Sequence, residues 1–284
     1  MYIGTTTAGR KDHFIVLEKG DDAKSVQELI TEKNIKNLII SREIKEEDFL
    51  GNPDFKSIFQ LVEILHLNKI EIGESEKLYA FQNLKRFEIV DCTHHCKEPI
   101  DFLNFTNLEE VVMPYSKRFV NLFNHPKLKM IMLENFNQPK FIFPENNVLE
   151  TLSIEKSKDC DWSSLTNFNN LISLYLVKVP SLIDISWMPH LSNLKDIELS
   201  NCKKVENCIE NIANIKTLDT IFLSYMGDFE TLEPLKKLSH LKELNIENGG
   251  KLTDNKNVDF LFDMPNLEFG IDMRNCKCSD NCVK

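Results

Sequence analysis

The apolar spacing LxxLxL recurs along most of this 284-residue chain. One copy is Leu194, Ile197 and Leu199 in "LSNLKDIELSNC", and the stretch from Pro265 to Cys276 nearly repeats it, with one extra residue. Nine copies begin at residues 62, 84, 108, 128, 149, 171, 194, 218 and 241, so the period is 20 to 24 residues. A fixed period of this length predicts a repeat architecture, because one short coil cannot bury its apolar edge unless it stacks on another.

The longer spacing LxxLxLxxC, which ends at Cys202 in this stretch and at Cys92 in "LKRFEIVDC", resembles the consensus of the leucine-rich-repeat family. Residues 229–246 are similar to its short-repeat, internalin-like class, in which a Pro-Leu turn precedes the next strand. The resemblance covers Val62 to Cys276 and implies an α/β solenoid. This would be a leucine-rich-repeat horseshoe with a parallel concave β-sheet and short, mostly irregular convex segments. We expect a stand-alone protein, and abundant Lys, Asn and Ile favour a bacterial source.

The repeats predict one continuous domain with a cap at each end. Residues 61–276 would hold about ten repeats, and residues 277–284 a carboxy-terminal tail or cap. Residues 1–60 would form an amino-terminal cap of a strand, a helix and a candidate first repeat at Ile35, Leu38 and Ile40. The helix is predicted from Asp22 onward, with Ser25 and Glu28 at the spacing of a capping box.

The strand of each repeat predicts which side chains face outward. Alternate residues point to opposite faces, so the two apolar residues of LxL point inward and the residue between them points out. At the extra residue in "LEFGIDM" we expect a β-bulge that keeps Ile271 and Met273 inward and places Asp272 in the outward row that holds Asn245. The predicted outward face is apolar and acidic together. The residues on it that we expect to bind a partner are Glu88, Glu110, Val112, Tyr115, Met130, Met132, Glu134, Tyr175, Val177, Asp196, Glu198, Phe222, Tyr225 and Glu243.

Exposed apolar side chains rimmed by charge are typical of protein interfaces. The formal net charge of −10 argues against duplex nucleic acid and anionic membranes, whose phosphates attract clustered Lys and Arg. The sequence therefore predicts a non-catalytic protein-binding module that engages a folded, basic protein. An inhibitor or immunity protein and a regulatory adaptor both fit this pattern, and the oligomeric state stays open.

Sequence motifs for catalysis and for cofactors are absent. The chain contains no GxxxxGK[ST], GxGxxG, GxSxG or HExxH run, so we expect neither an enzyme nor a bound cofactor. Its first residues lack the apolar core of a secretory signal, and no stretch is apolar over a membrane-spanning length. A cytoplasmic location is expected on these grounds.

Three of the eight cysteines, Cys92, Cys202 and Cys276, occupy the same position of the repeat, where we expect small buried side chains. The run "CTHHC" that begins at Cys92 has residue types that bind zinc, but it lacks the distant second pair of ligands of a structural site. We expect this run to be a solvated convex loop. Cys160 and Cys208 are also expected in convex loops.

The carboxy-terminal run "CKCSDNC" leaves one alternative function open. Cys276, Cys278 and Cys282 lie in a terminal segment that could fold around a metal ion. The alternative hypothesis is a metal-binding or redox protein that uses these three residues.

Overall fold

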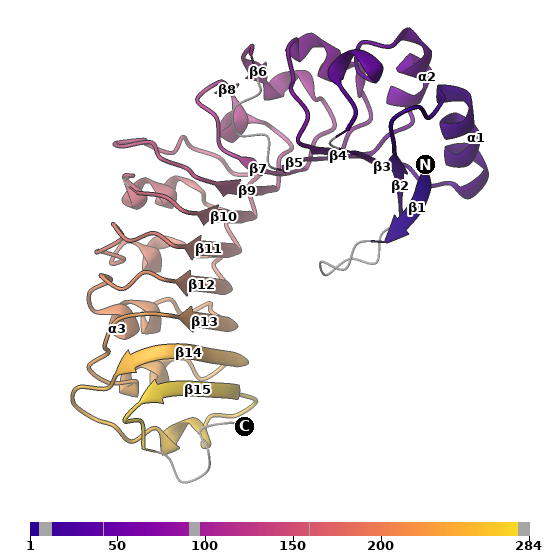
Figure 1. The fold of residues 1–284 in the computed structure, drawn as a ribbon. Helices are drawn as coiled ribbons and strands as arrows, with labels where there is room; N and C mark the ends of the chain where they lie inside the picture. Colours follow the sequence, from indigo (N-terminus) through magenta and orange to yellow (C-terminus); the bar gives the residue numbers. More distant parts are fainter. Residues whose placement is uncertain (6–12, 42, 91–96, 159, 278–284) are drawn as a thin grey trace. The chain divides into compact units, whose positions relative to one another are not determined.

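The computed structural model describes residues 1–5, 13–41, 43–90, 97–158 and 160–277. The chain forms two compact units, Met1–Leu133 and Glu134–Lys284. Each unit is a stack of coils in which a short strand alternates with a turn of helix or loop (Figure 1). Within the described ranges, no helix is both long and apolar enough to cross a bilayer.

The sheet of the first unit runs in the order β1-β2-β3-β4-β5-β7-β9. β1 and β2 are antiparallel, whereas β2 through β7 pair in parallel, so the repeating stack begins at β2. The strands are β1 (Tyr2–Thr5), β2 (His13–Leu17), β3 (Asn37–Ile40), β4 (Ile64–Asn68), β5 (Arg86–Val90), β7 (Glu110–Pro114) and β9 (Met130–Glu134), and a separate pair is β6 (Ile100–Asp101) with β8 (Phe119–Val120).

The sheet of the second unit runs in sequence order from β10 to β15, and every neighbouring pair is parallel. Figure 1 shows these strands one after another with their arrowheads pointing the same way. They are β10 (Thr151–Glu155), β11 (Ser173–Val177), β12 (Asp196–Ser200), β13 (Thr220–Ser224), β14 (Glu243–Lys251) and β15 (Glu268–Arg274).

Short helices return the chain from the end of one strand to the start of the next. Most of the described helices are 3-10 helices of three to six residues, which agrees with the predicted short and mostly irregular convex segments. The α-helices are α1 (Ala23–Lys33), α2 (Lys56–Phe59) and α3 (Cys208–Ala213). The 3-10 helices are η1 (Glu46–Asp48), η2 (Pro53–Phe55), η3 (Ser75–Ala80), η4 (Phe102–Asn104), η5 (Leu122–Asn124), η6 (Trp162–Asn167), η7 (Met188–His190), η8 (Glu233–Lys237) and η9 (Asp259–Leu261).

The core of each unit is built from the inward residues of LxL, as the spacing predicts. On β11 and β12, Leu174, Leu176, Ile197 and Leu199 are at most 1% exposed, whereas the residues between them are partly exposed. The parallel register stacks Leu174 on Ile197 and Leu176 on Leu199. Burial of these side chains drives the coils together, because the apolar edge of one coil is covered only by its neighbours.

Backbone turns with positive φ join each strand to the next segment of its coil. In the second unit the turn residues include Lys156, Lys178, Asn201 and Tyr225, with φ between 51° and 57°. Each of their N–H groups donates to a carbonyl of the following coil, as Asn201 N does to Ser224 O at 2.8 Å. The turns therefore satisfy backbone groups that the strands leave unpaired.

Polar side chains just before the first apolar position of a repeat add a second set of bonds between coils. Asparagine amides make most of them, and each donates to a carbonyl of the preceding coil. The bonds are Asn83 to Gln60 and Asn107 to Gln82 in the first unit, and Asn170 to Asn147, Asn193 to Asn169 and Thr217 to Leu194 in the second.

The amino-terminal cap has the predicted strand and helix, but the predicted capping box is wrong. The helix cap is Asp22, whose carboxylate accepts from Ser25 N at 2.9 Å and from Ser25 Oγ at 2.7 Å. Asp22 is preferred because its carboxylate reaches the free N–H groups of the first turn, which leaves Ser25 within the helix. Leu38 and Ile40 of β3 are buried, and β3 pairs in parallel with β4.

The predicted bulge is also misplaced. Phe269, Ile271 and Met273 all point inward along an unbroken β15, and the register shifts lie in β14 after Ile246. Asn245 is therefore paired with Gly270 rather than with Asp272. The shift follows the glycine pair at the end of β14, since a Cβ on Gly250 would overlap the carbonyl oxygen of Gly227.

One prediction concerns His125, a fully buried side chain of the first unit. Its Nε2 lies 3.0 Å from Phe105 O and its Nδ1 accepts from Lys127 N, so the neutral ring satisfies both partners. Burial lowers the pKa of His125, and nearby Lys127 lowers it further. The unfolded chain therefore takes up a proton first as the pH falls below about 6.5, and the unfolding free energy decreases.

We expect the urea midpoint of the protein to fall between pH 7.5 and 5.5, and to fall less in His125→Gln. His240→Gln, at an exposed histidine, is the control and should follow the parent protein. The same pH dependence in all three proteins would contradict the buried neutral histidine.

Candidate functional site

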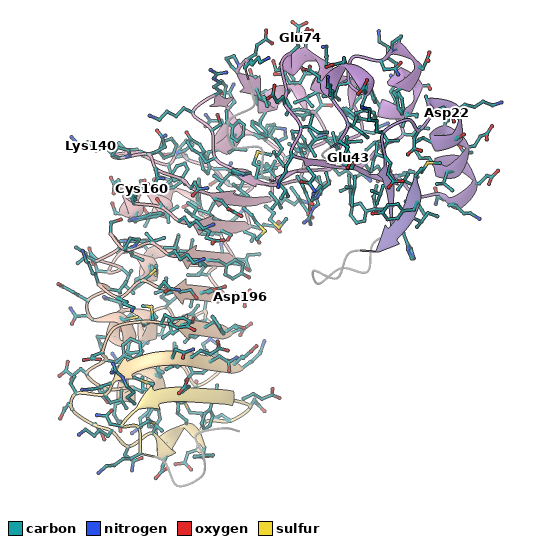
Figure 2. The ribbon with its side chains drawn as sticks, viewed as in Figure 1. Asp22, Glu43, Glu74, Lys140, Cys160 and Asp196 are labelled. Carbon is teal, nitrogen blue, oxygen red and sulfur yellow. The ribbon has the colours of Figure 1, made fainter. Side chains whose placement is uncertain are left out.

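The outward residues of the second unit form three rows that cross its strands. The central row follows from the register, which sets Tyr175 beside Glu198 and Glu198 beside Phe222. Figure 2 shows Asp196, from the row beside it, at the opposite side of the unit from Cys160. The full central row is Ser153, Tyr175, Glu198, Phe222, Asn245 and Gly270. We call the outward face of β10 to β15 the second-unit sheet face.

Carboxylates on the second-unit sheet face are ion-paired at β10 but not from β12 onward. Glu155 at the end of β10 contacts Lys156 and Lys178, and Glu134 at the end of β9 also contacts Lys156. From β12 onward, none of the acids on this face contacts a cation among the described residues. These unpaired acids are Asp196, Glu198, Glu243, Glu247, Glu268 and Asp272.

Serine hydroxyls orient two of these carboxylates. Ser200 Oγ donates to Glu198 Oε1 at 3.0 Å, and Ser173 Oγ donates to Asp196 Oδ2 at 3.0 Å. Both serines are less than 9% exposed, so they hold the carboxylates from beneath. Sequence reasoning missed these serines because it weighed only large and charged side chains. The sequence pattern that could have predicted them is a small polar residue at an outward position beside an acid.

Aromatic side chains lie among these acids. Tyr175 and Phe222 are partly exposed in the central row, and Tyr225, just after β13, is 47% exposed. Tyr225 has a φ of 51°, a conformation that an aromatic residue rarely adopts. Glycine aside, every other described residue with positive φ is Asn or Lys. An exposed aromatic in a strained turn is the kind of outlier that accompanies function.

Outward acids of the first unit, in contrast, form ion pairs within the protein. Glu88 contacts His66 Nδ1 at 2.8 Å and pairs with Arg86, which also binds Glu110 Oε2 through Nη1 at 2.8 Å. Burial by itself would raise the pKa of Glu88, but its bonds to His66 and Arg86 hold that pKa below its usual value. Glu88 and Glu110 are thus neutralised within the protein and are weaker candidates for contacting a partner.

The other predicted site residues are distributed as follows. Val112, Met130 and Met132 are partly exposed on β7 and β9 of the first unit, and Val177 is partly exposed at the end of β11. Tyr115 lies beyond the end of β7 and packs edge-on against Phe119, with ring centroids 6.1 Å apart. Burial raises the pKa of the Tyr115 hydroxyl. Tyr115 therefore serves local packing.

The cysteine predictions have mixed outcomes. Cys202 is buried, as predicted, and burial raises its pKa to about 11. Cys276 is only partly buried, against the prediction, because it follows the last described strand and no further described coil covers it. Cys208 was expected in a loop but begins α3, where burial raises its pKa to about 12. Cys160 is partly buried outside the strands.

The metal and redox alternative falls largely outside the described residues. Cys92 and Cys96, as well as Cys278 and Cys282, lie in segments that the structure does not describe. Among the residues that it does describe, no three His, Cys, Asp or Glu side chains are grouped to hold a metal ion. The alternative stays a prediction.

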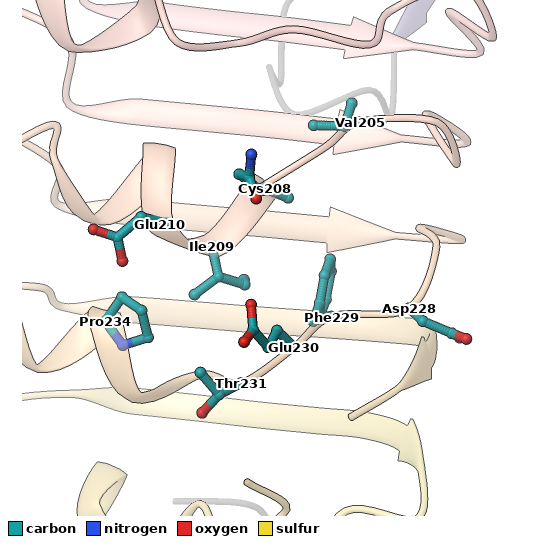
Figure 3. Close-up of a pocket in the computed structure, with 10 residues that line it drawn as sticks. Val205, Cys208, Ile209, Glu210, Asp228, Phe229, Glu230, Thr231 and Pro234 are labelled. Carbon is teal, nitrogen blue, oxygen red and sulfur yellow. The ribbon is translucent and has the colours of Figure 1, made fainter. Parts of the chain in front are cut away.

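A cavity of about 350 Å³ lies between α3 and the segment that follows β13 (Figure 3). Ile209, Phe229 and Pro234 give it an apolar lining, and Glu210 and Glu230 lie beside them. Glu210 already binds Lys237 Nζ at 2.6 Å, and the buried Cys208 thiol has a raised pKa, so it is a poor nucleophile. The cavity thus combines an apolar lining with the carboxylates of Glu210, Asp228 and Glu230.

Comparison with solved structures agrees with this architecture. The chain is similar to a leucine-rich-repeat protein of Leptospira interrogans, LIC12759, with 15% identity over 86% of this chain and 74% of that one, and a TM-score of 0.50. An internalin of Listeria monocytogenes, InlF, shares 18% identity over 82% of this chain and 71% of that one, with a TM-score of 0.48. No protein-family model matches the chain. The chain therefore has the leucine-rich-repeat fold.

Proposed function

We propose that the chain binds a folded, basic protein through the second-unit sheet face and catalyses no reaction. The observation that carries this proposal is the set of unpaired carboxylates from β12 to β15, interleaved with exposed aromatic rings. A rigid parallel sheet holds these side chains in fixed rows. Binding to such a surface needs little rearrangement of the protein, which favours affinity.

The acids of this surface favour a partner that carries positive charge. No described cation pairs with those from β12 onward, so they produce a negative potential that attracts Lys and Arg on an approaching protein. The net charge of −10 adds to this attraction at long range. Duplex nucleic acid and anionic lipid would be repelled by the same field.

The aromatic rings supply apolar contact area at the centre of the same surface. Tyr and Phe side chains that lose water on binding contribute strongly to affinity, and charged residues around them set specificity. Tyr175 and Phe222 are partly exposed in the free protein, and Tyr225 is 47% exposed. The left-handed turn at Tyr225 suits a residue selected for contact rather than for stability.

Two roles fit such a module, both in the cytoplasm. An inhibitor or immunity protein would cover the active surface of a toxin such as a nuclease, and the toxin would lose activity. A regulatory adaptor would hold an enzyme such as a phosphatase and leave its active site open. The free, buried thiols of Cys202 and Cys208 suit a reducing compartment. Activity of the captured protein in the bound state distinguishes the two roles.

The first prediction of this proposal concerns charge on the second-unit sheet face. A variant with Asp196→Asn, Glu198→Gln, Glu243→Gln and Glu247→Gln removes four unpaired charges and moves the net charge from −10 to −6. We expect it to recover basic proteins from a lysate of the native cell at least about tenfold less well than the parent protein does. Quantitative mass spectrometry of the captured proteins measures the change.

The matched control removes four exposed acids from the connecting segments of the same unit and reaches the same net charge. It should retain the partner. Equal losses in both variants would show that only net charge matters, and equal recovery by all three proteins would rule out this face. The control substitutions are Glu145→Gln, Glu206→Gln, Asp254→Asn and Asp263→Asn.

The second prediction concerns Tyr225. Asn adopts the left-handed conformation at low cost, so Tyr225→Asn should raise the unfolding free energy by about 1 kcal/mol while it weakens binding to the captured protein. Tyr225→Phe keeps both the ring and the strain, and should retain both parent values. Urea unfolding and a binding titration make the two measurements. Loss of stability in Tyr225→Asn, or unchanged affinity, would contradict the assigned role.

A further inference from the structure

The central row of the second-unit sheet face has a more specific arrangement than a general acidic surface. Tyr175, Glu198 and Phe222 are direct neighbours in the register of β11, β12 and β13. Adjacent strands lie about 4.8 Å apart, so the two aromatic residues flank the carboxylate at roughly 10 Å from each other. An acid between two rings is a different binding element from an acid alone.

The residues around this trio keep the space above it open. On β11, β12 and β13 the other outward residues are Ser173, Val177, Asp196, Ser200, Thr220 and Ser224, and four of these six are Ser or Thr. The three serines are less than 9% exposed, so they lie below the level of the rings. These small side chains leave the two rings accessible to a group that approaches the carboxylate from solvent.

The Glu198 carboxylate is held in place by a hydrogen bond and has no described cation as a partner. Ser200 Oγ donates to Glu198 Oε1 at 3.0 Å, and no described cation contacts Glu198. Asp196, two residues earlier on β12, presents a second outward carboxylate that Ser173 holds in the same way. A bound cation would meet one carboxylate between the rings and another beside them.

We propose that Tyr175, Glu198 and Phe222 form a receptor for an arginine side chain of the basic partner. This inference rests on the proposed function and specifies its chemistry. A guanidinium is planar, stacks on aromatic faces and donates two parallel hydrogen bonds to a carboxylate, so it uses both parts of the trio. A lysine ammonium is compact and more strongly hydrated, so it gains the charge attraction but little stacking.

The test uses fluorescently labelled octa-arginine and octa-lysine peptides, which carry equal charge, with fluorescence anisotropy at about 0.15 M salt, where surface charges are partly screened. The full chain should bind octa-arginine at least about fivefold more tightly than octa-lysine. Tyr175→Leu/Phe222→Leu keeps the acids and the apolar character. It should bind both peptides with the affinity that the parent protein has for octa-lysine.

Phe260→Leu removes an aromatic ring from η9, outside the sheet, and should keep the preference for arginine. Circular dichroism and urea unfolding check that each variant is folded. A preference that survives in the double leucine variant would overturn the receptor. The parent protein could instead bind both peptides equally, and the variant with Asp196→Asn, Glu198→Gln, Glu243→Gln and Glu247→Gln could bind neither. That result would overturn the receptor but leave the proposed function standing. Failure of both peptides to bind the parent protein would overturn both.

Discussion

The register between neighbouring parallel strands is the constraint on which the rest of this structure depends. A coil of 20 to 24 residues has one apolar edge, and stacking covers that edge only if LxL residues of adjacent coils lie side by side. Leu174 on Ile197 and Leu176 on Leu199 meet this condition. A slip of one residue would turn the apolar set outward and the polar set inward. The same register therefore fixes the core and the outward rows at once.

The outward positions are free of the packing constraint, and the two units use them differently. In the first unit, Glu88 forms ion pairs with Arg86 and His66, and both partners belong to the same sheet. In the second unit, serines orient carboxylates that no described cation neutralises, as at Glu198. A charge that is already paired contributes little to a new contact, because the existing pair must first be broken. For this reason the proposed binding site lies in the second unit.

The sequence predicted the features that follow from apolar spacing: the repeat, the parallel strands, the inward LxL residues and the short convex segments. It could not predict features that depend on contacts between coils. The ion pairs of Glu88 arise between strands, and the exposure of Cys276 reflects its place after the last described strand. The predicted capping box at Ser25 and Glu28 was wrong because Asp22, three residues before Ser25, is the better helix cap. The predicted bulge in β15 was wrong because the register shift lies at the glycine pair of β14. The strain at Tyr225 has no sequence signal apart from an aromatic residue where other repeats have Asn or Lys.

The central claim is that the side chains of Tyr175, Glu198 and Phe222 stand in one outward row. Nuclear Overhauser effects between backbone protons of β11, β12 and β13, recorded on the labelled chain, test it most directly. The account predicts cross-strand contacts in the register that sets Tyr175 beside Glu198 and Glu198 beside Phe222. Contacts that set Ile197 or Leu199 beside Tyr175 instead would turn Glu198 to the opposite face and contradict the account.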